Sequence, residues 1–330
     1  MSAGRPRGPI IVVAAVEFPG ELLDVETEAL AGLGATILDL RDRPLGSILA
    51  DLARADALLT EGIERVDATV IAAMRQCRVI GVYAVGTDGI DVAAATARRI
   101  LVANVPDYCT IEVAEHTIAL VLAAWRRIPR AERVARSGSW AIDDLQPVRR
   151  LAGRTLGLLG YGRIAREVAV RARAFGVNVI AHDPYIRAQS DHDDVRLCGR
   201  EELLRASDIL SIHLPATAET VGSVEATALA LLPEGAILVN AGRGAIVDET
   251  ALLAALQSGR LAAAAVDVLS CEPPPVGHPL LALDTVICTP HMAYYSEESV
   301  TALRRRAATN VRLVLEGRMP ASVVNGEALR

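Results

Sequence analysis

Short apolar runs alternate with segments of helical spacing along most of this chain. In the first third, such runs predict five strands, at Ile10–Ala15, Ala35–Leu40, Ala57–Leu59, Val79–Val82 and Ile100–Val102. Beyond residue 150, six further strands are predicted, at Thr155–Leu159, Asn178–His182, Ile209–His213, Ala236–Asn240, Ala263–Asp267 and Val286–Thr289. Because helical segments separate these runs, the pattern predicts an α/β protein.

Two long helices mark where the chain passes between two predicted α/β domains. They are Thr110–Arg127, with Thr110 as its N-cap, and Ser296–Glu316, with Ser296 as its N-cap and Gly317 as its stop. Two shorter helices are predicted at Arg163–Phe175 and Glu249–Ser258, the latter closed by Gly259, and a strand-like end at Met319–Val324. We expect one domain to be inserted into the other: residues 1–103 with 295–330 form the first, residues 104–294 the second, and the long helices act as hinges.

Composition narrows the classes of partner. The chain has 330 residues, 52% hydrophobic and 3% aromatic, enough for two domains with aliphatic cores. The net charge is −6 and no basic block stands out, which argues against nucleic acid as a partner. The chain contains no lysine, which excludes a Schiff-base lysine or a P-loop and leaves arginine as the only strong anion clamp.

Five cysteines are scattered along the chain, at Cys77, Cys109, Cys198, Cys271 and Cys288. Their odd number and the lack of CxxC spacing predict reduced thiols in a cytoplasmic protein, with no metal site. The apolar run Ile10–Val16 is short and meets Glu17 and Pro19, so it predicts a first strand rather than a signal peptide. No apolar stretch reaches the length that spans a membrane, and we expect no membrane partner.

A glycine turn between a strand and a helix is the most specific local pattern. Thr155–Leu159 is an apolar strand, Gly160 and Gly162 follow it, and Ala165 takes the place of the third glycine. Asp183 ends the next predicted strand, about 20 residues after the turn, where a carboxylate accepts hydrogen bonds from a ribose. These residues predict a dinucleotide site, with the pyrophosphate at the helix N-terminus. The alternative is an ordinary strand–helix turn with a surface aspartate.

Three polar residues follow three later strands of the same predicted domain: Arg243, Glu272 and His291. Open α/β sheets bind ligands at this end of their strands. Reduction of a 2-oxo acid needs a proton donor at the carbonyl oxygen, and histidine suits that task near neutral pH. A carboxylate on the far ring nitrogen stabilises the protonated ring, and a guanidinium grips the substrate carboxylate.

Each of these three residues also has a simpler interpretation. Arg243 is then a surface arginine, Glu272 a loop acid before the prolines at 273–275, and His291 a packed histidine bonded to backbone. The catalytic interpretation depends on all three converging beside the dinucleotide turn.

Four motifs in order carry a resemblance to a known family, at Gly157–Ala165, Asn240–Asp248, Asp267–Pro273 and Thr289–Ala293. On these motifs the chain resembles the D-isomer-specific 2-hydroxyacid dehydrogenases over nearly its whole length. Within that family it is most similar to the branch of the C-terminal binding proteins and their bacterial dehydrogenase relatives, on Asn104–Thr110, Glu112–Thr117 and Ala293–Glu298. The motifs are specific for the family and not for one substrate.

The resemblance implies two Rossmann-like or flavodoxin-like domains, with the cofactor domain inserted into the substrate domain. It implies that His291 is the acid/base, Glu272 its partner and Arg243 the substrate clamp. It implies NAD contacts from Thr117, Gly160, Tyr161, Gly162, Arg163, Ile164, Asp183, His213, Leu214, Pro215, Thr220, Ala241, Gly242, Arg243, Asp267 and His291. Substrate contacts are implied for Val85, Gly86, Thr87, Arg243 and Tyr294. It further implies hinge closure over the substrate, and a homodimer formed through the Thr110–Arg127 helix.

Two departures from the family pattern fall on the substrate pocket. Many relatives have arginine near the position of Val82, and several have tryptophan at the position of Tyr294. Asp183 would repel a 2′-phosphate, so NAD is expected rather than NADP, although Arg187 could soften that repulsion. Three functions remain: an NAD-dependent reductase of a small 2-oxo acid, a non-catalytic NAD(H)-sensing interaction protein, and a dehydrogenase of an oxyanion such as phosphite.

Overall fold

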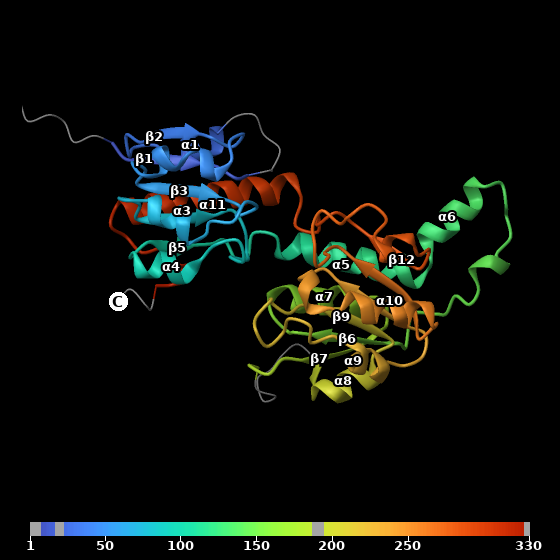
Figure 1. The fold of residues 1–330 in the computed structure, drawn as a ribbon. Helices are drawn as coiled ribbons and strands as arrows, with labels where there is room; N and C mark the ends of the chain where they lie inside the picture. Colours follow the sequence, from blue (N-terminus) through green and yellow to red (C-terminus); the bar gives the residue numbers. More distant parts are fainter. Residues whose placement is uncertain (1–7, 17–22, 187–194, 327–330) are drawn as a thin grey trace, which may run out of the picture. The chain divides into compact units, whose positions relative to one another are not determined.

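The chain divides into two compact units in a computed structural model, which describes residues 8–16, 23–186 and 195–326 (Figure 1). Unit 1 comprises Met1–Tyr108 and Ser296–Arg330, and unit 2, Cys109–Tyr295, is inserted into it. The first boundary lies at 108/109 rather than at 103/104. The reason is that Asn104 and Val105 still bind unit 1, where Asn104 Nδ2 donates to the Val85 carbonyl at 2.6 Å and Val105 N to the Ala84 carbonyl at 3.0 Å.

Unit 1 is built on a five-stranded parallel sheet in the order β2-β1-β3-β4-β5. The strands are β1 (Ile10–Val13), β2 (Thr36–Asp39), β3 (Ala57–Thr60), β4 (Val79–Val82) and β5 (Leu101–Ala103). The helices are α1 (Asp24–Ala29), η1 (Leu45–Ser47), α2 (Leu49–Leu52), α3 (Ala68–Ala73), α4 (Val92–Ala97) and α11 (Glu297–Leu315). Every residue of β1, β3 and β4 is buried, as expected of a parallel sheet covered on both faces.

Helix α11 begins and ends where the sequence predicts. Ser296 is its N-cap and forms a reciprocal capping box with Ser299, which satisfies two backbone groups at the helix start. Gly317 lies just beyond the last turn with φ +79°, a conformation that glycine adopts without strain.

A buried polar cluster joins α1, α11 and the end of β4. Glu26 is fully buried and accepts hydrogen bonds from Arg304 Nε at 2.9 Å and Nη2 at 2.6 Å. The Tyr83 hydroxyl, also buried, donates to Glu26 Oε1 at 3.0 Å. Burial and the charge of Glu26 raise the pKa of Tyr83 well above its usual range, so the phenol stays a proton donor.

The end of the described chain differs from the prediction. Residues 319–324 form no strand, although Val324 N donates to the Val102 carbonyl at 2.8 Å. The Asn325 side chain prevents a ladder here, because its Oδ1 accepts the Val102 N–H at 2.9 Å. A side chain therefore occupies the position that a neighbouring strand would take.

Unit 2 is built on a seven-stranded parallel sheet in the order β12-β11-β10-β9-β6-β7-β8. The strands are β6 (Thr155–Leu159), β7 (Asn178–His182), β8 (Arg196–Leu197), β9 (Ile209–Ile212), β10 (Ala236–Asn240), β11 (Leu261–Val266) and β12 (Val286–Cys288). Helices α5 (Thr110–Trp125) and α7 (Arg163–Arg173) pack on one face, and α8 (Arg200–Ala206), α9 (Ala226–Leu231) and α10 (Glu249–Gln257) on the other. The remaining elements are α6 (Ile128–Arg136), η2 (Asp143–Leu145), η3 (Gly244–Ile246) and η4 (Pro279–Ala282).

The first long helix is shorter than predicted and is capped differently. Thr110 is already the first residue of α5, and Cys109 is the N-cap, with no side-chain cap bond. The helix ends at Trp125 because Arg127 adopts a left-handed conformation, φ +54°, and α6 then begins at Ile128, with Pro129 in its first turn. The two-residue strand β8 was not predicted, since so short a segment carries no periodicity.

The strand order of unit 2 indicates which end of its sheet would bind a ligand. From the central strand β6 the chain proceeds through β7 on one side and then through β9 to β12 on the other. Ligands of open parallel sheets bind at such a reversal, beyond the carboxyl ends of the strands. Both units are therefore Rossmann-like, as predicted. Among the described residues, no helix combines the length and apolar character needed to cross a bilayer.

Candidate active site

Three neighbouring strands of unit 2 carry the predicted catalytic residues at their carboxyl ends. Arg243 follows β10, Glu272 follows β11, and His291 follows β12. These strands are parallel and adjacent in the sheet, so the segments that follow them lie along one edge. The glycine turn after β6 and Asp183 after β7 lie on the same edge.

His291 and Glu272 form a direct pair. His291 Nδ1 donates to Glu272 Oε2 at 2.6 Å, and Glu272 Oε1 accepts the Leu269 N–H at 2.8 Å. Burial opposes ionisation of Glu272, but the hydrogen bonds from His291 and Leu269 and the charges of His291 and Arg243 lower its pKa. The carboxylate is therefore ionised at neutral pH. The His291 side chain is 47% exposed, so the far ring nitrogen is accessible to a substrate.

The turn that carries His291 is held by Asp267. His291 has φ +49°, which is rare for a residue other than glycine, and its N–H donates to the Asp267 carbonyl at 2.8 Å. The Asp267 carboxylate, 1% exposed, accepts from Met292 N at 3.0 Å and Ala293 N at 2.9 Å. Asp267 thus fixes the backbone conformation that presents His291, a role that the sequence did not indicate.

A second histidine completes the support of this turn from α5. The Thr289 hydroxyl donates to Asp267 Oδ1 at 2.5 Å and accepts from His116 Nε2 at 2.9 Å. His116 Nε2 also lies 3.5 Å from Asp267 Oδ1. The sequence placed His116 only inside a long helix, because the contact spans 173 residues and no local spacing reports it.

Arg243 lies on a turn organised by Asn240. Asn240 Nδ2 donates to the Arg243 carbonyl at 3.0 Å, and Asn240 Oδ1 accepts the Gly242 N–H at 3.0 Å. One guanidinium nitrogen, Nη1, donates to the Gly242 carbonyl at 2.9 Å. The charge of Arg243 also helps to lower the pKa of Glu272. Arg243 is therefore part of the same electrostatic centre as the His291–Glu272 pair.

The glycine turn has the shape that a pyrophosphate needs. Gly160 has φ +92°, and a Cβ there would lie 2.7 Å from the His213 carbonyl oxygen. A Cβ on Gly162 would meet only open space, so the backbone is accessible. Gly162 is the N-cap of α7 and provides no side-chain cap, so the first N–H groups of the helix are left for an anion to bind. Asp183 lies against this turn, accepting from Tyr161 N and Tyr185 N at 3.0 Å each.

The segment after β9 lines the same edge of the sheet. Desolvation lowers the pKa of His213 to about 4, so its ring is neutral at neutral pH and does not compete with His291 as a proton donor. Leu214 is half-buried and Pro215 exposed, and the Thr220 hydroxyl donates to the Pro215 carbonyl at 2.5 Å. Thr220 therefore shapes this turn.

Other predicted contacts are placed as follows. Thr117 is fully buried in α5, and its hydroxyl donates to the Val113 carbonyl at 2.7 Å. The Tyr294 ring meets the His291 ring edge to face, with centroids 6.4 Å apart, whereas Val82 is fully buried. Val85, Gly86 and Thr87 follow β4 in unit 1 and are half-buried. Arg187 lies outside the described residues.

The chain is similar to a family of known dehydrogenases. Residues 118–293 match the family model described as "D-isomer specific 2-hydroxyacid dehydrogenase, NAD binding domain". A glyoxylate reductase of Aeropyrum pernix is 40% identical over 294 residues, covering 87% of this chain and 88% of that protein. A D-3-phosphoglycerate dehydrogenase of Archaeoglobus fulgidus is 41% identical over 253 residues, and this chain spans about half of its length, 48%.

The fold has the same relatives. The structure of a D-lactate dehydrogenase from Aquifex aeolicus, complexed with NAD and lactic acid, superimposes with a TM-score of 0.85 at 28% identity, covering 96% of this chain and 99% of that one. No C-terminal binding protein is among these three relatives, so that branch stays a prediction. The family itself is established by the matched domain and by the coverage: the chain belongs to the D-isomer specific 2-hydroxyacid dehydrogenases.

Proposed function

We propose that this protein interconverts a small 2-oxo acid and its D-2-hydroxy acid, with NAD(H) as the redox partner. The observation that carries the proposal is the 2.6 Å bond between His291 Nδ1 and Glu272 Oε2, on the same sheet edge as the glycine turn. None of the five cysteines, all of which lie in the described part of the chain, forms a disulfide, and we propose that the protein acts in a reducing compartment, the cytoplasm.

The turn after β6 supplies the groups that would hold NAD. The exposed backbone at Gly162 and the N–H groups at the start of α7 suit the pyrophosphate, and Asp183 suits the adenosine ribose. When bound, the nicotinamide ring supplies or accepts the hydride. The cofactor and substrate contacts proposed for the remaining predicted residues follow from the family resemblance.

In the proposed reduction, His291 donates a proton from Nε2 to the carbonyl oxygen of the substrate. Glu272 holds the ring by Nδ1 and stabilises its protonated form, because the carboxylate is ionised. Arg243 binds the substrate carboxylate and stabilises charge that develops on the oxygen. In the oxidation direction, the neutral His291 ring accepts the hydroxyl proton.

The proposal is tested by stopped-flow mixing of the protein, NADH and a panel of 2-oxo acids, followed by absorbance of NADH. We expect NADH consumption with at least one small 2-oxo acid. Ordinary NADH binding without turnover of any acid would favour the NAD(H)-sensing alternative. A parallel assay with NAD+ and phosphite tests the oxyanion alternative, because phosphite-dependent NADH formation would change the substrate class.

Asp183 leads us to expect a preference for NADH over NADPH. Its carboxylate lies against the turn where the adenosine end binds, and a 2′-phosphate placed there meets like charge. We expect kcat/KM with NADH to exceed that with NADPH by about tenfold or more. In an Asp183→Asn variant, which keeps an acceptor for Tyr161 N–H, the ratio should narrow. A higher kcat/KM with NADPH in the wild-type protein would contradict this assignment.

Replacing Arg243 with alanine should raise KM for the 2-oxo acid and lower kcat together. The guanidinium acts on the substrate in both the ground state and the transition state, so kcat/KM should fall by about 10² or more. Steady-state kinetics with Arg243→Lys as a matched variant separates charge from fork geometry, since lysine keeps only the charge. An effect on KM alone would limit Arg243 to binding.

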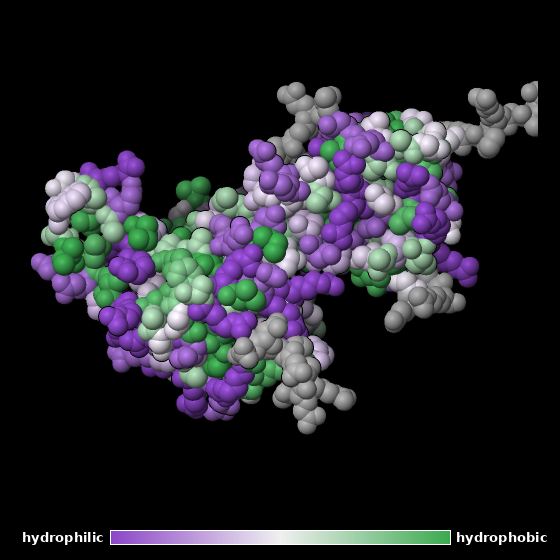
Figure 2. Space-filling view, turned by 180° about the vertical axis from the view of Figure 1, so that it is seen from behind, coloured by the Kyte–Doolittle hydropathy of each residue, from purple (hydrophilic) through white to green (hydrophobic). Residues whose placement is uncertain are grey.

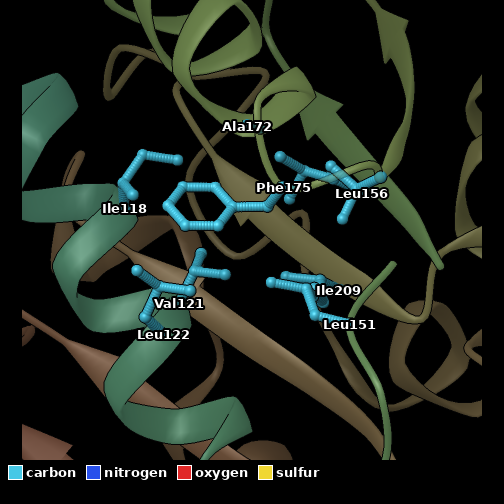
Figure 3. Close-up of a pocket in the computed structure, with 9 residues that line it drawn as sticks. Ile118, Val121, Leu122, Leu151, Leu156, Ala172, Phe175 and Ile209 are labelled. Carbon is cyan, nitrogen blue, oxygen red and sulfur yellow. The ribbon is translucent and has the colours of Figure 1, made fainter. Parts of the chain in front are cut away.

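The homodimer is proposed on the segment that follows α5. It leaves large apolar side chains in solvent: Ile128 is 55% exposed, Trp140 89% and Ile142 70%. Figure 2 shows hydrophobic side chains on the surface of unit 2. Figure 3 shows an apolar pocket in the same unit, in which the Phe175 ring points between Ile118 and Val121. A second copy of this chain is the partner that offers matching apolar surface.

Sedimentation velocity tests the dimer. We expect the wild-type protein to sediment as a dimer and a Trp140→Ser, Ile142→Ser double variant to shift toward monomer, because those exposed side chains would lose their partner surface. An Ile63→Ser variant is the matched control, since Ile63 is 54% exposed but lies in unit 1. A monomeric wild-type protein at micromolar concentration would contradict the assignment.

A further inference from the structure

Unit 2 contains a further histidine–carboxylate pair, away from His291 and His116, that the proposed mechanism does not use. Glu249 is the first residue of α10, and His278 immediately precedes η4. His278 Nε2 donates to Glu249 Oε2 at 3.1 Å, and the two side chains are only 12% and 19% exposed. A pair this well enclosed is held in one arrangement, unlike the exposed ion pairs on the surface of the same unit.

Glu249 binds both ends of one loop. Its second oxygen, Oε1, accepts the Ser270 N–H at 2.6 Å, while Oε2 binds His278. The chain between these two points is Ser270–His278, and it contains Glu272, the partner of His291. A single carboxylate therefore closes the loop on which one half of the catalytic pair is mounted.

The loop has little else to hold it. Leu269 and Leu280 are buried at its two ends, but Ser270, Glu272 and the neighbouring residues are exposed. Three prolines at 273–275 remove backbone donors, and the one backbone hydrogen bond within the described loop, from His278 N to the Pro275 carbonyl at 3.1 Å, lies at its far end from Glu272. The position of Glu272 consequently depends on the anchors at 270 and 278.

The start of the loop packs tightly against the turn of Arg243. A Cβ on Gly244 would lie 2.0 Å from the Leu269 carbonyl carbon, so the two backbones touch with no space between them. A movement of Ser270 would therefore carry Leu269, which donates to Glu272 Oε1, and would disturb the segment next to Arg243. The loop anchors and the catalytic centre are mechanically connected through this contact.

The chemical state of His278 fits a permanent anchor. Its Nδ1 is buried and has no hydrogen-bond partner in the described part of the chain. Nδ1 is then a bare acceptor and Nε2 carries the proton that Glu249 accepts, because a buried N–H without a partner is the more expensive state. The ring acts as a hydrogen-bond donor to Glu249.

We propose that Glu249 and His278 are positioning residues for the reaction. The pair fixes loop 270–278 so that Glu272 binds His291 Nδ1. Glu272 then holds the catalytic ring in its orientation and stabilises its protonated form. This proposal rests on the proposed function, because Glu249 and His278 can affect the reaction only if His291 takes part in it. Supports of this kind in other sites commonly change activity by about 10- to 100-fold when they are removed.

The experiment compares Glu249→Ala and Glu249→Gln in the full-length protein. Glu249→Ala should lower kcat for 2-oxo acid reduction by about tenfold or more and leave the Kd for NADH within about twofold. The pH at which kcat declines on the alkaline side should also move downward, because a displaced Glu272 stabilises the protonated His291 ring less. The other ionisable groups near that ring, Tyr294, Asp267 and Arg243, are unchanged in these variants. Glu249→Gln keeps one acceptor oxygen, which can bind Ser270 N–H or His278 Nε2–H but not both, so its kcat should fall between those of Glu249→Ala and the wild-type protein.

Asp248→Ala is the matched control, because Asp248 caps the same helix through Thr250 N and Ala251 N but does not bind the loop. It should lower the melting temperature and leave the pH profile of kcat unchanged. If Asp248→Ala reproduces the kinetic shift, or if Glu249→Ala keeps wild-type kcat and pH profile, the positioning role is wrong.

Hydrogen exchange separates this proposal from the proposed function. Amides at Leu269 and Ser270 should exchange faster in Glu249→Ala than in the wild-type protein or in Asp248→Ala. A wild-type protein without turnover would overturn the dehydrogenase activity, and the exchange rates would still decide whether Glu249 holds the loop. Unchanged exchange at these amides would overturn the anchor itself.

Discussion

Glutamine at position 291 should lower kcat for 2-oxo acid reduction by about 10²- to 10⁴-fold, the range typical of a lost general acid. The amide side chain is close to imidazole in size and can still bind Glu272, but it cannot release a proton near neutral pH. The site proposed for NADH is the turn after β6, which this change does not touch. Single-turnover rates and NADH fluorescence titration, measured on the same preparation, report the two effects separately.

His182→Gln is the control for that experiment. His182 ends β7, and its Nδ1 contacts the Cys198 carbonyl at 3.0 Å, on the side of the sheet away from β12. The control should keep kcat close to the wild-type value. Unchanged turnover in His291→Gln would remove His291 from the mechanism, and a parallel loss of NADH affinity would show that the variant had disturbed the whole cofactor edge.

Arg304→Met should lower the free energy of unfolding by about 3–5 kcal/mol, because it leaves a buried carboxylate without its cation. Glu26 is fully buried and accepts two hydrogen bonds from Arg304, so without Arg304 its charge would be neither paired nor solvated. Methionine matches the length of the arginine stem, which limits the loss of packing. Urea unfolding followed by circular dichroism measures the change.

Two further variants identify the cause of that destabilisation. Arg305→Met removes the neighbouring pair with Glu28, which is exposed on both sides, and should leave the unfolding midpoint nearly unchanged. Adding Glu26→Leu to Arg304→Met should restore much of the lost stability, since the orphaned charge is then gone. A double variant as unstable as the single one would place the effect in packing and not in the buried charge.

The sequence predicted those parts of the fold that depend on local pattern. Eleven of the twelve strands in the described part of the chain follow from apolar runs within a residue or two at each end, as at β6 and β10. The capping signal at Ser296 was also local, and its bonds are present. Two predictions were wrong for one reason, which is that the fold places other groups where local chemistry favoured a cap and a strand. Thr110 was predicted as a helix cap, but Cys109 takes that position. Residues 319–324 were predicted as a strand, but the Asn325 side chain binds Val102 N there.

The sequence predicted the three chemically active residues of the candidate site, but not the residues that hold them in place. Arg243, Glu272 and His291 were found because each follows an apolar strand, a rule that needs no knowledge of which strands are neighbours. The groups behind them, Asp267, His116 and Glu249, act through contacts between segments far apart in the chain. Their partners are set by strand order and helix packing, which a single sequence does not reveal.

The contact between Asn325 and Val102 has a consequence for the edge of unit 1. Strand β5 lies at the margin of its sheet, where free N–H and C=O groups could serve as a template for another polypeptide. At Val102 both groups are occupied, the N–H by Asn325 and the C=O by Val324. The chain's own tail thus guards this margin against unwanted strand addition and the aggregation that follows from it.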